Sequence, residues 1–320
     1  MKMKKITKQI LCLVSVALVF MLMNLTIYHL FTYRCINRYS DVMQAKSIEL
    51  AEYLPFKEDS GIVKTKASLI LEGELPVIDG AAALYPVFSA FVHALYPEES
   101  VSFDGADFST ESRLQMSNTR GSYRGVVDGT VDIAICAAPS AEQLAYAEEN
   151  DVELCFVPIG REAFVFLVNK KNPVNDLTVE EIRGIYGGEY RYWDELGGEH
   201  KRIGALQRNA GSGSQTAMLS LMGEMPMKKD YDTFLASCIG FSFRYYVEDV
   251  VEDGNVKMLS LDGVYPNTES IKNETYPIVS NFYAVYRRDN ENANIPLILN
   301  WILSEEGQQI IEQTGYVGVN

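Results

Sequence analysis

Two near-continuous apolar runs constrain the fold of this 320-residue chain more than any other feature. The segments VDIAICAAP (131–139) and AFVFLVN (163–169) contain almost no polar side chains, as expected of strands that are buried on both faces of a sheet. Segments with a helical spacing of apolar residues lie around them. Strands that alternate with helices predict an α/β fold with mostly parallel sheets.

Helix start signals support this alternation. Ser140 and Gln143 have the spacing of a capping box, and so do Thr178 and Glu181. Each pair precedes a segment with helical character. Further predicted elements are a helix within 85–97, a strand within 276–288 and one or two helices within 294–315.

The N-terminus carries the clearest local signal. Residues 1–8 supply four lysines, and residues 9–33 follow without a formal charge. About 20 apolar residues span a bilayer, so this run is long enough for a transmembrane helix. No small-residue cleavage site ends it, which favours an uncleaved anchor over a cleaved signal peptide. We therefore predict a cytoplasmic tip and single-pass membrane anchor at 1–34, with a cytoplasmic N-terminus, and a juxtamembrane stalk at 35–66.

Composition and charge argue against several classes of function. The net charge of −15 makes nucleic acid a poor partner, because its phosphates repel an acidic protein. The five cysteines form no CxxC pair and the chain has three histidines, so we expect no metal site. No nucleophile–base constellation is present in the sequence, and we expect no catalytic residues and no cofactor. A disulfide between Cys136 and Cys155 is conceivable if their strands are adjacent.

The segment QRNAGSGSQTAM (207–218) has the chemistry of an anion-binding loop. Its glycines allow the backbone to approach a ligand, and its serines offer hydroxyl donors. If Ser214 begins a helix, free N–H groups point outward there and the helix dipole favours negative charge. Arg208 adds a planar, permanently charged fork that suits oxyanions. From the pattern alone, a solvated turn with an incidental arginine is an equal alternative.

Four segments, in order along the chain, carry a family resemblance. They are GSYRGVVDGTVDIAICAAPS (121–140), PIGREAFVFLVNKKNPVNDLTVEEIRGIYGGEYRYWDELGG (158–198), QRNAGSGSQTAM (207–218) and WILSEEGQQIIEQTGYV (301–317). Together they resemble the phosphate-binding proteins of bacterial ABC importers, which have the type II periplasmic-binding-protein fold. The resemblance extends from Leu75 to Val317.

This resemblance implies two α/β lobes that are joined by a two-stranded hinge and close around a ligand in the cleft between them. It implies that lobe one comprises residues 67–165 and 280–320, and lobe two residues 166–279. The hinge is expected near FLVN (166–169) and NFYAVY (281–286).

The resemblance also implies a set of ligand-binding residues. The family's arginine matches Arg208, its Ser-Gly-Ser matches residues 212–214, and its second-loop hydroxyl falls near Thr119. In the first loop, Ala82 and Ala83 offer only backbone N–H donors. The predicted site for phosphate or a related oxyanion consists of Arg208, Gly211, Ser212, Gly213, Ser214, Thr119, Ala82 and Ala83.

Two departures from the family weaken the physical basis for selecting phosphate. Ala82 stands where the family commonly has a serine or threonine, and Ala137 stands where it usually has an acid that accepts the proton of phosphate. Asp79 and Asp132 are candidates to replace that acid, but Asp132 is expected instead to cap or pack near its strand. A lost charge-assisted hydrogen bond costs about 1.5–3 kcal/mol, so we expect poorer affinity or specificity than in a standard family member.

The leading interpretation is a membrane-anchored, extracytoplasmic solute-binding protein that delivers phosphate or a related oxyanion to an ABC permease with a cytoplasmic ATPase. Such a protein is not an enzyme. The alternative is a membrane-anchored phosphate sensor or scaffold with a degraded ligand site, which the alanines at 82 and 137 favour modestly. Arg244 is a second candidate for anion contact. Tyr245 and Tyr246 are expected to pack beside a strand, with lining of the cleft as the alternative.

Overall fold

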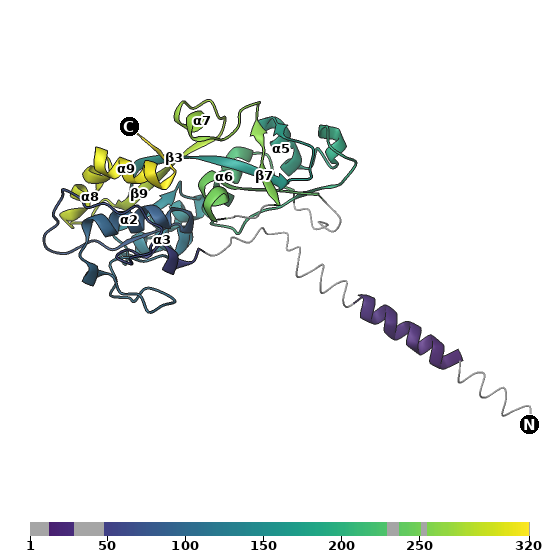
Figure 1. Ribbon diagram of the computed structural model, residues 1–320, viewed down its shortest axis with the longest axis horizontal. Helices are drawn as coiled ribbons and strands as arrows, with labels where there is room; N and C mark the ends of the chain where they lie inside the picture. The colour runs from purple at the N-terminus through teal and green to yellow at the C-terminus, as the bar shows by residue number, and fades with distance from the viewer. Residues whose placement is uncertain (1–12, 29–47, 229–236, 251–254, 320) are drawn as a thin grey trace, which may run out of the picture.

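The computed structural model describes residues 13–28, 48–228, 237–250 and 255–319. Two α/β lobes form the body of the molecule, and a further helix lies on the N-terminal side (Figure 1). Each lobe has a hydrophobic core of its own. The two-lobed α/β architecture expected from the sequence is confirmed.

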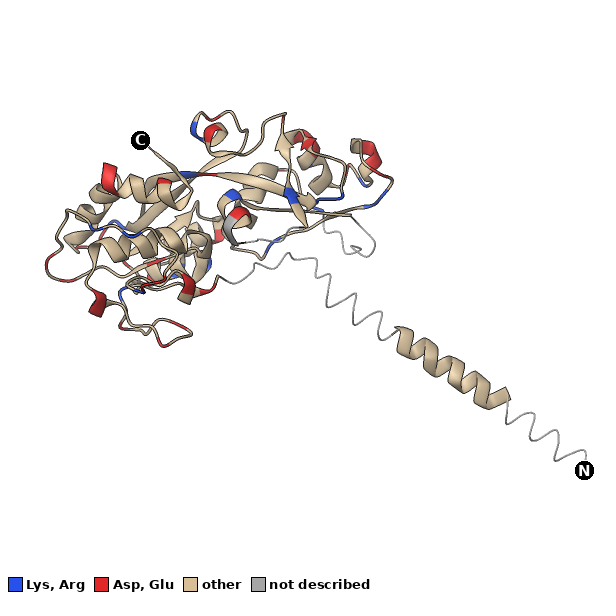
Figure 2. Ribbon diagram, in the orientation of Figure 1, with Lys and Arg blue, Asp and Glu red and all other residues tan. Residues whose placement is uncertain are grey.

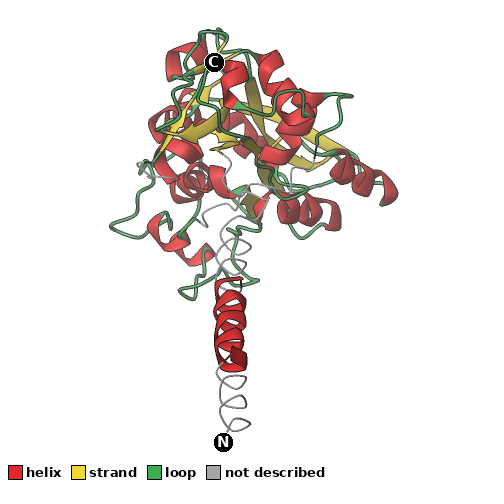
Figure 3. Cartoon of the chain, turned by 90° about the vertical axis from the view of Figure 1, so that its right-hand side faces the viewer, coloured by secondary structure: helices red, strands yellow, loops and turns green. Residues whose placement is uncertain are grey.

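Lobe one is built around the first core, and its strands are covered by helices (Figure 3). The strands are β1 (Ile78–Gly80), β2 (Ile133–Ala137), the first part of β3 (Leu154–Asn169), β9 (Val279–Arg287) and β10 (Val317–Gly318). The helices are α2 (Tyr85–Leu95), α3 (Asn118–Asp128), α4 (Ala141–Glu149), α8 (Asn294–Ile302) and α9 (Glu305–Thr314), with short 3₁₀ turns η1 (Leu50–Glu52), η2 (Ala82–Leu84) and η3 (Glu98–Ser100).

Lobe two surrounds the second core and receives the rest of β3. Its other strands are β4 (Asp176–Leu177), β5 (Ile203–Ala205), β6 (Ser237–Phe243), β7 (Val256–Met258) and β8 (Ser260–Leu261). Its helical segments are α5 (Val179–Gly187), the 3₁₀ turn η4 (Trp193–Leu196), α6 (Gly213–Met222), the π turn η5 (Tyr246–Val250) and α7 (Thr268–Lys272).

The predicted local signals act as expected. Both capping boxes form: the Ser140 and Thr178 side chains accept hydrogen bonds from the N–H groups of Gln143 and Glu181, whose side chains bond back to the cap residues. The apolar run at 131–139 becomes β2, which is almost wholly buried. The C-terminal helical pattern forms two helices, α8 and α9.

The long strand β3 links the two lobes. The sheet order is β1-β2-β9-β3-β6-β5, so one sheet runs through both lobes. Up to Ala163, β3 pairs with β9 in lobe one, and from Phe164 it pairs with β6 in lobe two. This change of partner lies N-terminal to the segment 166–169 where the hinge was expected.

The expectation of mostly parallel sheets is wrong. Parallel pairing occurs between β1 and β2, β5 and β6, and β4 and β8. The other pairings between named strands in the described part of the chain are antiparallel. The reason is that β3 and β9 lie in the middle of the sheet and run in opposite directions. β9 is also antiparallel to β2, and β3 is also antiparallel to β6, β7 and β10. Alternation of strands and helices alone does not reveal this.

The conceivable disulfide between Cys136 and Cys155 is also wrong. Cys136 of β2 lies opposite Tyr283 of β9, and Cys155 of β3 lies opposite Tyr286 of the same strand. Because β9 separates the two strands, the cysteines are two strand spacings apart, about 10 Å, which is too far for a disulfide. Both thiols are free.

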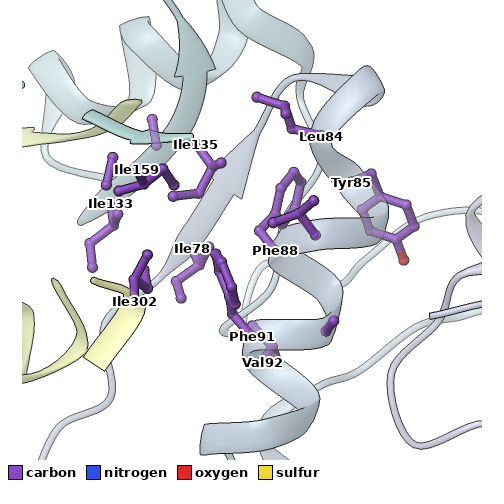
Figure 4. Packing of buried hydrophobic residues seen from close by; sticks show 14 of the residues in the cluster. Ile78, Leu84, Tyr85, Phe88, Phe91, Val92, Ile133, Ile135, Ile159 and Ile302 are labelled. Carbon is purple, nitrogen blue, oxygen red and sulfur yellow. The ribbon is translucent and has the colours of Figure 1, made fainter. Parts of the chain in front are cut away.

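The core of lobe one holds β1 and β2 against α2. Ile78, Ile133 and Ile135 from the strands meet Phe88 and Phe91 from the helix, and all five are at most 1% exposed (Figure 4). Burial of each such side chain stabilises the fold by about 1.5–3 kcal/mol. This packing fixes the carboxyl ends of the two strands, from which the turn of η2 and Ala137 extend.

Residues 48–66, which belong to the predicted stalk, lie against lobe one. Ile48 and Ile62 are buried in its core. The Ser89 hydroxyl of α2 donates to the Tyr53 carbonyl oxygen at 2.5 Å, and the Phe56 N–H donates to His93 Nδ1 at 3.2 Å. The remainder of the predicted stalk, residues 35–47, lies outside the described residues.

The predicted membrane anchor is described only in part. Residues 13–28 form a helix that carries no charged residue (Figure 2), and its large apolar side chains are exposed, from 51% at Met23 to 70% at Leu13. Among the described residues, no helix combines the length and the apolar character needed to cross a membrane. Residues 1–12 and 29–34 of the predicted anchor lie outside them.

Candidate functional site

A cavity of about 530 Å³ lies between the two lobes. The parallel strands β1 and β2 of lobe one end at it, and so do the parallel strands β5 and β6 of lobe two. Ligands of α/β sheets bind at such carboxyl ends. All residues of the predicted oxyanion site line this cavity: Arg208, Gly211, Ser212, Gly213, Ser214, Thr119, Ala82 and Ala83. Their role in binding is still a prediction.

The loop before α6 is held in one conformation by local hydrogen bonds. Gly211 has a φ of 75°, a left-handed conformation that glycine adopts without strain. The Ser212 hydroxyl caps the helix by accepting from the Gln215 N–H at 3.2 Å. The Gln215 side-chain oxygen accepts from the Arg208 N–H at 2.8 Å. The loop is therefore fixed at both ends, unlike a flexible Gly-Ser linker.

Helix α6 begins at Gly213, one residue earlier than expected, and its first turn faces the cavity. The first N–H groups of a helix have no partner within the helix, so the amides of Gly213 and Ser214 are available to a ligand. The Ser212 hydroxyl accepts a hydrogen bond from its own helix and still has a proton to donate. These groups and the helix dipole favour an anion at this point.

Arg208 is half-buried at the cavity wall. Burial lowers the pKa of its guanidinium, while a hydrogen bond with the Tyr246 side chain raises it. Arginine nevertheless stays charged in proteins because its ordinary pKa is so high. Its buried Nη1 has no hydrogen-bond partner among the described residues. A buried, charged donor without a partner is costly, and an anion in the cavity would satisfy it.

The lobe-one side of the cavity includes the start of α3. Thr119 is buried there, and Asn118 has a φ of 63°, a conformation that asparagine tolerates better than most residues. Asp79 anchors this turn from behind, because its carboxylate accepts from the Ser117 N–H at 2.8 Å and from the Ser117 hydroxyl. Burial raises the pKa of Asp79, and these hydrogen bonds oppose the rise.

Neither candidate for the missing acid lines the cavity. The Asp79 carboxylate accepts hydrogen bonds from Ser117 and is not part of the cavity lining. Asp132 accepts from the Val77 N–H at 2.8 Å and from the Asn290 side chain at 2.7 Å, so it also serves the fold. At the expected position of the acid, Ala137 presents a methyl group to the cavity. The suggestion that Asp79 replaces the acid is wrong, whereas the expectation that Asp132 caps or packs near its strand is confirmed.

The two lobes meet across the cavity. The Gln143 side chain of lobe one donates to the Gly211 carbonyl oxygen of lobe two at 3.5 Å. A Cβ atom on Gly213 would lie 3.3 Å from the Ala137 Cβ and 3.6 Å from the Thr119 hydroxyl oxygen. These distances show that the loop 208–214 of lobe two touches the facing wall of lobe one.

Glu162 is the only acidic residue among the described residues that line the cavity. It is 4% exposed and lies at the end of the lobe-one part of β3. Its carboxylate accepts from the N–H groups of Ala163 and Tyr245, and Arg244 Nε lies 3.4 Å from its Oε1. Burial raises the pKa of Glu162 to about 7, against the opposing effect of Arg244.

The raised pKa of Glu162 predicts that the free energy of unfolding depends on pH. Between pH 4.5 and 7 the folded chain binds more protons at Glu162 than the unfolded chain, so stability falls as the pH rises through this window. The loss is at most about 3 kcal/mol, at 1.36 kcal/mol per pKa unit. Urea unfolding should therefore show that the free energy of unfolding of Glu162→Gln, relative to that of the wild type, is higher at pH 7.5 than at pH 4.5. Glu180→Gln, at an exposed glutamate of α5, is the control. Parallel pH curves for wild type and Glu162→Gln would contradict the assignment.

Sequence reasoning missed several cavity residues. For Tyr246 packing beside a strand was preferred to lining of the cleft, yet it lines the cavity and contacts Arg208. Arg244 was a candidate for anion contact, but it bonds to Glu248 and to the Gly315 carbonyl oxygen and does not line the cavity. Asn118 and Glu162 carry no sequence signal apart from their places beside a helix start and within an apolar strand.

Comparisons with known proteins agree with this architecture. Among curated proteins, the chain is 26% identical to the phosphate-binding protein PstS of Bacillus subtilis over 251 residues, which cover 76% of this chain and 80% of that one. It is 23% identical to the protein of the same name from Borreliella burgdorferi over 178 residues, or 49% of this chain, and it spans 63% of that relative's length.

Solved structures show the same fold. A proposed phosphate ABC transporter substrate-binding protein from Clostridium perfringens, with bound phosphate, has a TM-score of 0.58 at 24% identity over 76% of this chain and 98% of its own. An ABC-type phosphate transport receptor from Vibrio cholerae has a TM-score of 0.55 at 19% identity, and the match covers 75% of this chain and 98% of that one. The family model described as a PBP superfamily domain matches residues 77–306, so the chain belongs to the PBP superfamily.

Proposed function

We propose that this chain is an extracytoplasmic solute-binding protein that captures phosphate or a related oxyanion between its lobes and passes it to an ABC permease. The observation that carries the proposal is Arg208, whose buried Nη1 lacks a partner at the wall of the cavity. The names of the relatives, as phosphate-binding proteins and phosphate transport receptors, support the same class of ligand. Such a protein binds and releases its ligand without catalysis.

In the proposed complex, lobe two supplies most of the binding groups. Arg208 provides the positive charge, Ser212 and Ser214 donate from hydroxyl groups, and Gly213 donates from its backbone N–H. Gly211 allows the chain to turn beneath the ligand. Charge-assisted hydrogen bonds of this kind contribute about 1.5–3 kcal/mol each, so a few of them suffice for a useful affinity.

Lobe one supplies fewer groups in this proposal. Thr119 donates a hydroxyl, and the first amides of η2, at Ala82 and Ala83, have no partner within that turn. No carboxylate stands at Ala137 to accept the proton of phosphate or to repel sulfate. We therefore expect weak discrimination between these two anions.

We further propose that the N-terminal segment anchors the protein in the cell membrane, with the lobes outside. The exposed apolar side chains of residues 13–28 support an apolar surrounding for this helix, because water-exposed apolar area of this size is unfavourable. The uncharged run that continues on both sides of it supports the same reading. The proposed lobe limits are those implied by the family resemblance, with the crossing at 165–166 and 279–280.

One experiment tests the binding and the anchor together. The full chain is taken in detergent from membranes that have been washed with alkaline carbonate, and it is titrated calorimetrically with phosphate and sulfate. We expect the protein to stay with the washed membranes and to bind both anions with affinities within tenfold of each other. Recovery in the carbonate wash would contradict the anchor. Absence of binding to either anion would contradict the solute-binding role, and submicromolar phosphate binding with rejection of sulfate would contradict the expected loss of selectivity.

A further inference from the structure

The cavity is larger than an inorganic oxyanion requires. Its volume is about 530 Å³. An anion of five heavy atoms takes on the order of 100 Å³, since one water accounts for about 30 Å³ of liquid. The loops of the two lobes touch at Gly211 and Gly213, so this volume lies between lobes that are in contact. Cavities of ~300–1,000 Å³ commonly hold larger organic ligands.

The space beyond the loop 208–214 has walls of a different chemistry. Near the loop, Ala82 and Ala137 line the cavity with methyl groups where the family places a hydroxyl and an acid. Where β3 changes partner, the lining includes Glu162, Ser242 and Ser280. The lining thus combines a cation and N–H donors with two alanine methyl groups and with acidic and hydroxyl acceptors.

The acceptor region, formed by Glu162, Ser242 and Ser280, is built into the sheet. Glu162 of β3 lies directly opposite Ser280 of β9 in an antiparallel pair, so both side chains project from the same face. Arg244 forms an ion pair with Glu162 and another with Glu248. When both carboxylates are ionised, the three groups carry a net charge of −1.

We propose that the ligand is a small organic phosphonate or phosphate monoester whose far end carries an ammonium or hydroxyl donor for Glu162. This inference rests on the proposed function, because it places the oxyanion of the ligand at Arg208 and the α6 N-terminus. The carbon linker lies against the methyl groups of Ala82 and Ala137. A hydroxyl and an acid at these positions would find no hydrogen-bond partner in the linker. The donor end is accepted by Glu162 and Ser280. The ligand class is thus defined by an oxyanion and a donor joined by a short apolar link.

Titration of the detergent-solubilised full chain with four probes tests the proposal. They are inorganic phosphate, ethylphosphonate, 2-aminoethylphosphonate and O-phosphoethanolamine, at pH 8, where Glu162 is ionised. Ethylphosphonate has the carbon linker but lacks the amine donor. Comparison of 2-aminoethylphosphonate with O-phosphoethanolamine tests whether the site prefers a P–C bond or a P–O–C linkage. We expect at least one amine to bind tenfold or more tightly than phosphate and ethylphosphonate.

Variants at the acceptor end provide the second readout. Glu162→Gln should reduce the preference for the amine over phosphate to about twofold, whereas Glu248→Gln, which alters the other partner of Arg244, should retain at least half of it. Ser280→Phe fills the same region and should reduce the preference without touching the ion pairs. Thermal unfolding of each variant establishes that it is folded before the affinities are compared.

The outcomes separate this inference from the proposed function. If phosphate binds, Arg208→Ala abolishes that binding, and neither amine binds more tightly than ethylphosphonate, the two-ended ligand is refuted and the oxyanion site stands. If none of the four probes binds, both fail. An amine preference that survives both Glu162→Gln and Ser280→Phe would overturn the assignment of the acceptor region.

Discussion

Replacement of Arg208 by alanine should weaken phosphate binding at least a hundredfold, with little change in stability. The side chain supplies a full positive charge and has a buried Nη1 without a partner among the described residues. Two charge-assisted hydrogen bonds at about 1.5–3 kcal/mol each amount to roughly 3–6 kcal/mol, and each 1.4 kcal/mol is a tenfold change in affinity. Because Nη1 is unsatisfied in the free protein, its removal also relieves a desolvation cost. Calorimetric titration of wild type and variant with phosphate measures the difference.

Two matched variants define what the loss means. Arg208→Lys keeps the charge but lacks the planar fork, so it should recover part of the affinity. Arg124→Ala removes an exposed arginine of α3 that pairs with Asp128 at 3.5 Å and does not line the cavity. It should leave binding unchanged, because exposed ion pairs contribute little. Equal losses at Arg208 and Arg124 would indicate a general charge effect, and an unchanged affinity in Arg208→Ala would remove the residue from the site.

Local signals in the sequence predicted the parts of the fold that local interactions decide. The two capping boxes formed because Ser140 and Thr178 satisfy helix N–H groups within three residues of themselves. The run that forms β2 was recognisable because a strand covered on both faces needs no polar residues. The direction of a strand, in contrast, is not set by local interactions. β9 is antiparallel to both β2 and β3, and its own residues do not indicate this.

The candidate site was predictable on one side and not on the other. The residues 208–214 are contiguous, and glycine, serine and arginine together have recognisable chemistry, so the loop stood out from its sequence. Glu162 did not, because it precedes an apolar run and reaches the cavity only where β3 passes from one lobe to the other. Its importance arises from contacts with residues about 80 to 120 positions away, at Arg244 and Ser280, which only the fold brings together.

Replacement of Gly307 by alanine should destabilise lobe one by about 3 kcal/mol. Gly307 is buried in the first turn of α9, directly after the short connection from α8. A Cβ there would lie 2.5 Å from three backbone atoms: Ile302 Cα, Ile302 O and Trp301 O. Backbone at a helix end cannot rotate aside as a side chain can, so α9 must move. Overpacking of this kind costs about 1–3 kcal/mol, and occasionally more.

The sign of this change makes the test decisive. Without a clash, alanine would stabilise a helix relative to glycine by about 1 kcal/mol, so a rise in stability would contradict the packing described here. Movement of α9 would also strain Gln308, whose side chain donates to the Ile159 and Ile302 carbonyl oxygens at 3.0 Å and accepts from the Val319 N–H at 2.8 Å. Gln309→Ala, on the exposed side of the same helix, is the control and should change the free energy of unfolding by less than about 0.5 kcal/mol. Urea unfolding of the three proteins gives the comparison.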